Sequence, residues 1–242
     1  MPRLAFFDLD RRDRQPELMD QPGLDDAQHR RALAGLRSIN VISRSSAILW
    51  SAVRRLAAEL GVRSLRVLDL ACGGGDVGIG LARTARRFGL DIVLVGCDRS
   101  PLALDVARAR ASRVEVAAQF IELDVLHDTL PSDFDVVTCS LFLHHLEESD
   151  AERLLRHMAE AARHLLLVND LVRSRFGYVL AWWGSRVLTR SHVVHVDGPL
   201  SVRAAFSPSE ALDLAKQAGL NGAVLSRHWP QRFLLSWRRR ES

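Results

Sequence analysis

The sequence predicts an α/β fold in which a mostly parallel sheet is packed between helices and ends in an antiparallel strand. Short apolar segments alternate with amphipathic ones between about residues 62 and 238, as expected for alternating strands and helices. Residues 66–82 change from an apolar strand pattern, through three consecutive glycines, to helical spacing. Acidic residues directly follow several of the predicted strands. These observations favour one seven-stranded domain over residues 62–238, preceded by a separate helical segment over residues 1–61.

The composition is that of a globular protein with one substantial core. The chain has 242 residues, of which 48% are hydrophobic, and its formal net charge is +4. A charge this small gives no reason to expect a nucleic-acid partner. The three cysteines, Cys72, Cys97 and Cys139, form no C-x-x-C pair, so reduced thiols are expected and a zinc site is not. Without a signal-peptide pattern or an apolar run of about 18 residues, the chain is expected to be cytoplasmic, and its oligomeric state stays open.

The first 61 residues are expected to form an arm and a helical cap. Residues 1–25 mix Asp, Arg, Gln and Pro without a clear period, which predicts a loosely held arm. Apolar residues at helical spacing predict helices over about 26–36 and 45–60, and Gly61 ends the second. Because these helices precede the first strand, they either pack on the sheet or cover its binding edge.

The stretch around Gly73–Gly75 carries the strongest functional signal. Residues 67–70 are a predicted buried strand and 77–88 a predicted helix, so the turn between them directs backbone N–H groups and a helix N-terminus at a ligand. Two ligand classes use such a turn. The glycine spacing Gly73-x-Gly75-x-x-Gly78 fits the dinucleotide fingerprint, with Asp98 placed 20 residues later as a ribose-binding acid. The glycines alone do not decide between the two classes.

The acids around the turn favour the second ligand class. The stretch Asp69-Leu-Ala-Cys-Gly-Gly-Gly75 resembles the D-x-G-x-G-x-G loop of class I S-adenosylmethionine-dependent methyltransferases, with Ala71 in place of the first glycine. Asp98 follows the predicted strand 91–97, and a third predicted strand, 120–124, ends in Asp124. In these methyltransferases a strand that ends in this way presents its acid to the adenine amino group, whereas dinucleotide enzymes have no fixed need for an acid there.

From about residue 62 to 238, the order of predicted elements resembles the Rossmann-like class I methyltransferase fold, a mostly parallel seven-stranded sheet with an antiparallel terminal strand. The resemblance implies S-adenosyl-L-methionine as the cofactor. It places the glycine turn at the methionine end, Asp98 at the ribose hydroxyls and Asp124 at the adenine. The residues implied to bind the cofactor are Asp69, Ala71, Cys72, Gly73, Gly75, Asp98, Arg99, Asp124, Val125 and Ser140.

Residues 134–146 indicate the kind of acceptor. Residues 135–139 form a predicted strand, and the apolar loop after it carries His144 and His145. This pattern is similar to the fourth-strand region of small-molecule methyltransferases, including those of quinone and polyketide pathways. It lacks the Asn/Asp-Pro-Pro-aromatic tetrapeptide of nucleic-acid amino methyltransferases, so the resemblance implies a small aromatic acceptor and no nucleic-acid partner. We predict O-methylation of an aromatic hydroxyl, with His145 as general base and His144 as the fallback, because apolar burial favours the neutral imidazole.

No metal is expected. Asn169 and Asp170 end the predicted strand 164–170, and they resemble the metal-binding acid–amide pair of catechol-type methyltransferases. The partner carboxylate of that pair is missing, since Cys139 and Ser140 stand at the end of the fourth strand.

Residues 173–203 are too long for a simple connection and are predicted to line the acceptor pocket. Residues 176–183 are apolar nearly all round, and such a helix must be covered by protein, by ligand or by a membrane surface. A pocket wall is the preferred interpretation and peripheral membrane contact the second. The residues predicted to bind the acceptor are Tyr178, Trp182, Trp183, His192 and His195. A capped helix from Ser207 and a hairpin over 223–226 and 233–237 follow.

Other functions stay open at this stage. C-methylation of a quinone-type ring uses the same cofactor, and a non-catalytic cofactor-binding partner protein would keep the same turn. An NAD-dependent oxidoreductase would need a hydride-transfer site. The chain has no Tyr-x-x-x-Lys pair, since Tyr178 is its single tyrosine and Lys216 its single lysine.

Overall fold

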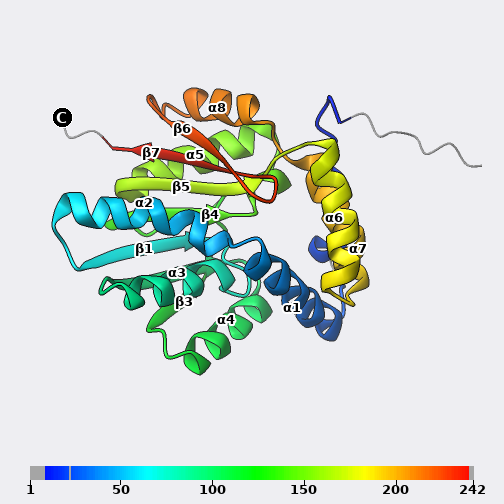
Figure 1. The fold of residues 1–242 in the computed structure, drawn as a ribbon, viewed down its shortest axis with the longest axis horizontal. Helices are drawn as coiled ribbons and strands as arrows, with labels where there is room; N and C mark the ends of the chain where they lie inside the picture. Colours follow the sequence, from blue (N-terminus) through cyan, green and yellow to red (C-terminus); the bar gives the residue numbers. More distant parts are fainter. Residues whose placement is uncertain (1–8, 22, 240–242) are drawn as a thin grey trace, which may run out of the picture.

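The sheet has seven strands, as predicted, and one of them runs against the other six (Figure 1). A computed structural model of the chain describes residues 9–21 and 23–239. The strand order is β3-β2-β1-β4-β5-β7-β6, in which β7 pairs antiparallel with both β5 and β6. The strands are β1 (Ser64–Leu70), β2 (Asp91–Asp98), β3 (Ala118–Glu122), β4 (Phe134–Ser140), β5 (Ala162–Leu171), β6 (Val224–His228) and β7 (Arg232–Arg238).

The predicted helices are present, whereas the helix over His192–Ala204 was not predicted. The first predicted helix runs to Ile42 instead of residue 36. The described helices are α1 (Asp26–Ile42), α2 (Ser45–Leu60), α3 (Asp76–Arg87), α4 (Pro101–Arg113), α5 (Glu148–Ala161), α6 (Arg175–Leu188), α7 (His192–Ala204) and α8 (Pro208–Gln217), with 3-10 turns η1 (Leu18–Asp20) and η2 (Leu143–His145). In the part of the chain that the structure describes, no helix has the length and apolar character needed to cross a membrane.

Alternate residues of the central strands fill two cores, one on each face of the sheet. On one face, Val136 and Leu165 pack with α2, α3 and α4. On the other, Val137 and Leu166 pack with α5 and α8. Because both faces are buried, the register of each strand is strongly specified, and so is the position of the polar residues at its end.

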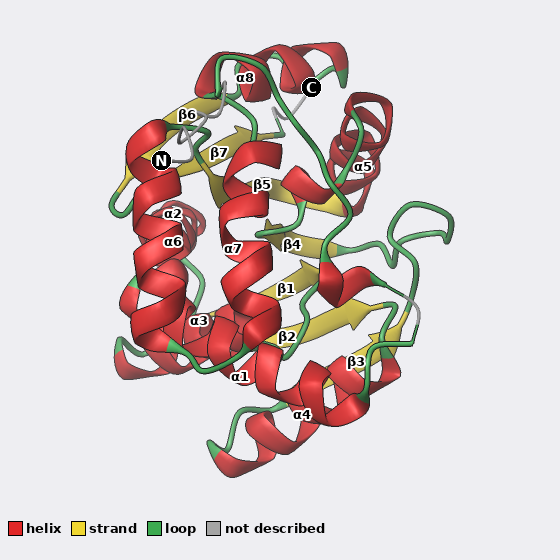
Figure 2. Ribbon diagram, turned by 90° about the vertical axis from the view of Figure 1, so that its right-hand side faces the viewer, coloured by secondary structure: helices red, strands yellow, loops and turns green. Residues whose placement is uncertain are grey.

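The carboxyl ends of the parallel strands are covered by α1, α6, α7 and residues 9–21, which lie together on this side of the sheet (Figures 1 and 2). Residues 9–21 are hydrogen-bonded to α7, which corrects the prediction of a loosely held arm for this part of the chain, and residues 1–8 of the predicted arm lie outside the described residues. The backbone N–H of Asp13 donates to the carbonyl of Arg203 at 3.1 Å. The N–H groups of Leu18 and Met19 donate to the carboxylate of Asp197 at 2.8 and 3.0 Å. The arm is therefore a fixed cover over the edge where α/β sheets bind ligands.

Candidate active site

A cavity of about 1000 Å³ lies at this covered edge of the sheet. Its walls come from the glycine turn, the loops after β2, β3 and β4, the arm, and helices α1, α6 and α7. Ligand pockets reach about 1,000 Å³, so the cavity can hold a nucleoside cofactor and a small acceptor together. Apart from Gly75, the residues predicted to bind the cofactor line it: Asp69, Ala71, Cys72, Gly73, Asp98, Arg99, Asp124, Val125 and Ser140.

The glycine turn forms one wall of the cavity. Ala71 has φ +49° and Gly73 has φ +51°, both in the left-handed region. The positive φ of Ala71 explains why the D-x-G-x-G-x-G loop that this stretch resembles has glycine at the same position. A Cβ at Gly73 would meet only a methyl group of Leu33 at 4.0 Å, so the space over this residue is open to a ligand. Gly75 faces the core instead, where a Cβ would lie 2.9 Å from Ile79, and its predicted cofactor contact is corrected.

Carboxylates surround the turn. The two oxygens of Asp98 accept hydrogen bonds from the N–H groups of Gly73 and Ser100 at 2.8 and 2.9 Å. Asp69 is buried below the turn, where it accepts a hydrogen bond from Thr138 Oγ1 at 2.8 Å, and burial raises its pKa to about 6. The N–H of Gly73 is thus already engaged and the local charge is negative. Such a turn suits a cationic sulfonium or ammonium group better than a pyrophosphate, so its residues fit S-adenosylmethionine.

The loop after β3 closes the cofactor end of the cavity. Asp124 accepts a hydrogen bond from the N–H of Leu126 at 2.9 Å, which fixes the loop. Val125 is buried beside it and adds an apolar wall. The guanidinium of Arg99 lies 3.6 Å from Asp20, so this end of the cavity meets the arm that covers it.

His144 is buried in the cavity wall and is held by Asp170 at the end of β5. Its Nδ1 lies 2.6 Å from one Asp170 oxygen, and its backbone N–H donates to the other at 3.1 Å. Burial works to raise the pKa of Asp170, but the contacts with His144 outweigh burial and hold it below its usual value. An ionised carboxylate only accepts hydrogen bonds, so Nδ1 of His144 is the donor in this pair.

His145 is in a different electrostatic state from the predicted one. Its Nδ1 lies 2.9 Å from Asp20, and its Nε2 lies 3.9 Å from Glu17. Burial works to lower the pKa of His145, but Glu17 and Asp20 outweigh burial and raise it to about 9. His145 is therefore an imidazolium at neutral pH, and the expectation that burial keeps it neutral as the general base is corrected.

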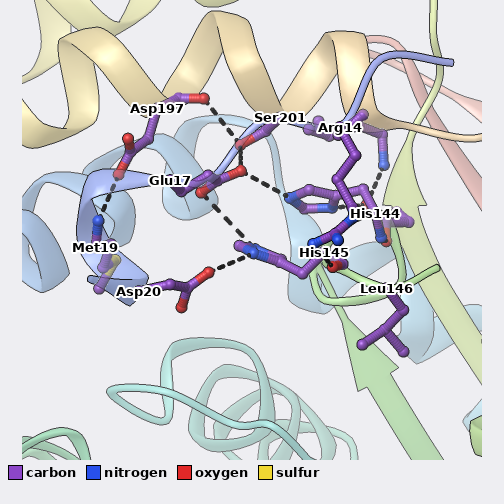
Figure 3. A network of polar contacts seen from close by, with 12 residues as sticks. Arg14, Glu17, Met19, Asp20, His144, His145, Leu146, Asp197 and Ser201 are labelled. Atoms are coloured by element: carbon purple, nitrogen blue, oxygen red, sulfur yellow. Dashed lines mark hydrogen bonds and ion pairs between the residues drawn. The ribbon is translucent and has the colours of Figure 1, made fainter. Parts of the chain in front are cut away.

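Glu17, which the sequence did not single out, joins the two histidines (Figure 3). It is buried, and Ser201 of α7 donates a hydrogen bond to it at 2.7 Å. Its two carboxylate oxygens face Nε2 of His144 and Nε2 of His145, each at 3.9 Å. The three residues offer ligand atoms within 4.8 Å of one another, so among the described residues they form a cluster that could hold a metal ion.

Helix α6 lines the cavity with small and aliphatic side chains, and its tryptophans lie elsewhere. The α6 residues in the wall are Gly177, Leu180, Ala181, Gly184, Ser185 and Leu188. Trp183 is 61% exposed and Trp182 is 36% exposed, and neither belongs to the wall. Tyr178, His192 and His195 are outside it too. The predicted set of acceptor-binding residues is therefore corrected, because α6 turns its small residues inward and its bulky aromatic residues to solvent.

Residues 67–164 match the family model described as a methyltransferase domain. This part of the chain therefore has the sequence pattern of a methyltransferase domain. The fold of the chain is similar to that of magnesium protoporphyrin IX methyltransferase from Synechocystis PCC 6803, solved with bound S-adenosylhomocysteine, at a TM-score of 0.57 and 20% identity over 82% of this chain and 84% of that one. The same enzyme with bound S-adenosylmethionine gives a TM-score of 0.54 at 18% identity, over 92% of this chain and 88% of that one. At 20% and 18% identity, these two neighbours show the likeness of the fold.

The relatives of this methyltransferase domain include quinone-pathway proteins. Ubiquinone biosynthesis O-methyltransferase from Alkalilimnicola ehrlichii is 32% identical over 131 residues, which are 53% of this chain and 50% of that protein. Demethylmenaquinone methyltransferase from Deinococcus radiodurans is 39% identical over 89 residues, which are 36% of this chain and 35% of that protein. The chain thus spans about half the length of the first of these relatives.

Proposed function

We propose that this protein transfers a methyl group from S-adenosylmethionine to an oxygen of a small aromatic, quinone-related acceptor. The cofactor is supported by the acidic glycine turn and by the methyltransferase domain match. The acceptor class is supported by the similarity to ubiquinone biosynthesis O-methyltransferases. The observation that carries oxygen as the acceptor atom is the contact between His144, which lines the cavity, and the buried carboxylate of Asp170.

The chemistry requires a proton to leave the acceptor. S-Adenosylmethionine, when bound, supplies an electrophilic methyl group on a sulfonium. A neutral phenol has a pKa of about 10 and is a weak nucleophile, so a base that takes its proton accelerates transfer by about 10²–10⁴-fold. His144 is suited to this role, because Asp170 fixes the proton on Nδ1 and leaves Nε2 as the acceptor. The ionised Asp170 also stabilises the imidazolium that forms.

His145 has a complementary role. The ring centroids of His144 and His145 are 4.4 Å apart, so the two side chains share one corner of the cavity. Because His145 is already protonated at neutral pH, it cannot take the acceptor's proton. Its positive charge instead stabilises the phenolate oxygen that forms beside it.

The arm holds both histidines in place. The guanidinium of Arg12 donates to the backbone carbonyl of His144 at 2.9 Å, and that of Arg14 donates to the carbonyl of His145 at 3.2 Å. These bonds fix the loop that carries the histidines and also close the cavity over them. A closed, water-poor cavity favours methyl transfer, because an in-line displacement depends on alignment and on the exclusion of water.

C-methylation of a quinone-type ring is the second candidate. It is favoured by the similarity to demethylmenaquinone methyltransferase. An acidic or enolate-like carbon acceptor needs a general base less than a phenol does. The dependence of turnover on His144 therefore separates the two candidates.

The function is tested by methyl transfer from methyl-labelled S-adenosylmethionine to a panel of phenols and hydroquinones, with NMR of the product to distinguish O-methyl from C-methyl groups. Calorimetry against S-adenosylhomocysteine and NADH runs in parallel. We expect S-adenosylhomocysteine to bind, NADH not to bind, and an O-methyl product. A C-methyl product would establish the second candidate. Binding of S-adenosylhomocysteine without turnover of any acceptor would favour a non-catalytic partner protein, and binding of NADH alone would favour an oxidoreductase.

A further inference from the structure

Three polar residues at the carboxyl edge of the sheet carry all the buried side-chain nitrogen and oxygen atoms that lack a hydrogen-bond partner among the described residues. They are Ser140 at the end of β4, Asn169 near the end of β5 and Arg232 at the start of β7. Buried polar groups nearly always have partners, so unpartnered groups gathered on three neighbouring strands require an explanation.

The strand register places the three side chains on one face of the sheet. Ser140 pairs directly with Asn169, and Arg232 pairs with Leu171, two residues further along β5. Alternate residues of a strand share a face and neighbouring strands lie about 4.8 Å apart, so the three side chains form a short row. Asp170, which lies between Asn169 and Leu171, points to the opposite face. At this edge, strand β5 therefore presents Asn169 to one face of the sheet and Asp170 to the other.

Arg232 has the strongest need for a partner. It is 3% exposed and lines the cavity. Its NH2 donates to Ser43 Oγ at 3.0 Å, whereas its Nε and NH1 have no partner among the described residues. Burial lowers its pKa to about 10, so the side chain is still charged at neutral pH. The carboxylate of Asp170 attracts it but is hydrogen-bonded to His144. A buried charge without a counter-charge is costly, so the site is completed by a ligand that brings a negative charge.

We propose that Arg232, with Asn169 and Ser140 beside it, binds an anionic oxygen of the acceptor, such as an aryl carboxylate. This inference rests on the proposed function, since it places an aromatic acceptor in the cavity. A neutral ligand leaves the guanidinium uncompensated, so the row selects acceptors that carry a negative charge. Strands β4 and β5 separate β7 from β1, where the glycine turn begins. At about 4.8 Å per strand this is a distance of about 14 Å, which puts Arg232 at the acceptor end and not at the cofactor end.

The test uses the full-length protein saturated with S-adenosylhomocysteine and two probes that differ in charge, 2-hydroxybenzoate and 2-hydroxybenzamide. Calorimetry is expected to give at least tenfold tighter binding of 2-hydroxybenzoate, and Arg232→Met is expected to remove this preference. Asn169→Asp keeps the shape of the side chain and places a carboxylate on the face of the sheet that carries Arg232. This variant is expected to weaken the binding of 2-hydroxybenzoate at least tenfold and to leave the binding of 2-hydroxybenzamide unchanged. Arg227→Gln removes the same charge from the exposed part of the same hairpin and is the matched control.

Two sets of results overturn the proposal. The first is that the wild type binds neither probe or binds both equally, or that folded Arg232→Met or Asn169→Asp keeps the wild-type preference for 2-hydroxybenzoate. The second is a loss of S-adenosylhomocysteine affinity in Arg232→Met as large as the loss for 2-hydroxybenzoate, which would assign the arginine to the carboxylate of the cofactor. Failure of the wild type to bind S-adenosylhomocysteine contradicts the proposed function itself, so the two failures are distinguishable.

Discussion

Asp170 holds His144 at two points, with 2.6 Å between a carboxylate oxygen and the ring Nδ1 and 3.1 Å between the other oxygen and the backbone nitrogen. The two residues come from β5 and η2 and are 26 positions apart in sequence. Because both the ring and its backbone are fixed by one carboxylate, the orientation and tautomer of the imidazole are set before an acceptor binds. Such preorganisation is what a general base requires.

The first prediction concerns this pair. Replacing His144 by Ala should lower kcat for a phenolic acceptor by about 10²–10⁴-fold, because the base is lost. Asp170→Asn should lower kcat as well, because the amide no longer fixes the tautomer. The affinity for S-adenosylhomocysteine, measured by calorimetry, should stay unchanged in both. His157→Ala, on α5 outside the cavity, is the control. Wild-type turnover in His144→Ala would show that His144 is not the general base and would favour catalysis by proximity alone.

The second prediction concerns the cofactor. Asp98 accepts hydrogen bonds from Gly73 and Ser100 and lines the cavity, so Asp98→Asn removes a charge and one of two acceptor oxygens without changing the shape of the side chain. A charge-assisted hydrogen bond contributes roughly 1.5–3 kcal/mol, so the dissociation constant for S-adenosylhomocysteine should rise at least about tenfold. Asp91→Asn, at the other end of β2, should bind as the wild type does. An unchanged dissociation constant in a folded Asp98 variant would exclude it from the cofactor site.

The cofactor end of the cavity was predictable from the sequence because its residues are close together in the chain. Asp69 and Asp98 directly end apolar strands, and parallel strands bring their carboxyl ends to one edge. The glycine spacing fixes the turn between them. Of the residues predicted to bind the cofactor, Gly75 alone does not line the cavity, because spacing alone does not tell which glycine faces the cavity and which faces the core.

The acceptor end was predicted poorly, because its residues meet only through the tertiary fold. Glu17 and Asp20 lie in a segment without periodicity, and their partners His144 and His145 are more than 120 positions away. No local pattern therefore indicated that these acids would raise the pKa of His145. The apolar character of α6 was clear from its sequence, but its composition does not tell which side faces the cavity, and so Trp183 was assigned to the pocket.

The third prediction concerns pH. The pKa of His145 is raised from 6.5 to about 9, so the folded state binds this proton more tightly than the unfolded state does. Stabilisation by Glu17 and Asp20 is therefore complete below about pH 6.5 and is lost as the pH rises through about 9; it is on the order of 3 kcal/mol. Between pH 7 and 10 the midpoint of thermal unfolding should fall more steeply for the wild type than for His145→Gln. Other titrating groups are common to both proteins, so equal slopes would show that His145 is not the group responsible.

The fourth prediction concerns metals. Turnover should be unchanged after treatment with EDTA, because His144 is proposed to act as a base and a base needs a free Nε2. Added Zn²⁺ should inhibit, since Glu17, His144 and His145 offer ligand atoms that suit zinc and binding would block that nitrogen. Glu17→Gln should require a higher Zn²⁺ concentration for the same fractional inhibition. Loss of turnover in EDTA, restored by a divalent cation, would instead make the cluster a metal centre.

The last prediction concerns the outer side of α6. Its tryptophans are exposed, and the guanidinium of Arg186 lies 4.0 Å from the centroid of a Trp182 ring. The β6–β7 hairpin extends this surface, because Phe176 and Trp229 have ring centroids 6.0 Å apart. Exposed large apolar side chains on this surface are Phe176, Val179, Trp182, Trp183, Val187 and Trp229. An apolar surface with arginine at its border suits an anionic lipid surface.

The protein should therefore sediment with vesicles that contain phosphatidylglycerol, and Trp183→Ser should weaken this binding several-fold. The KM for a water-soluble phenol should not change, since Trp183 does not line the cavity. Phe88→Ser is the matched control, because Phe88 is 64% exposed but follows α3, away from this surface. If Trp183→Ser instead raised the KM and left vesicle binding unchanged, Trp183 would be assigned to the acceptor pocket, as its sequence pattern predicts.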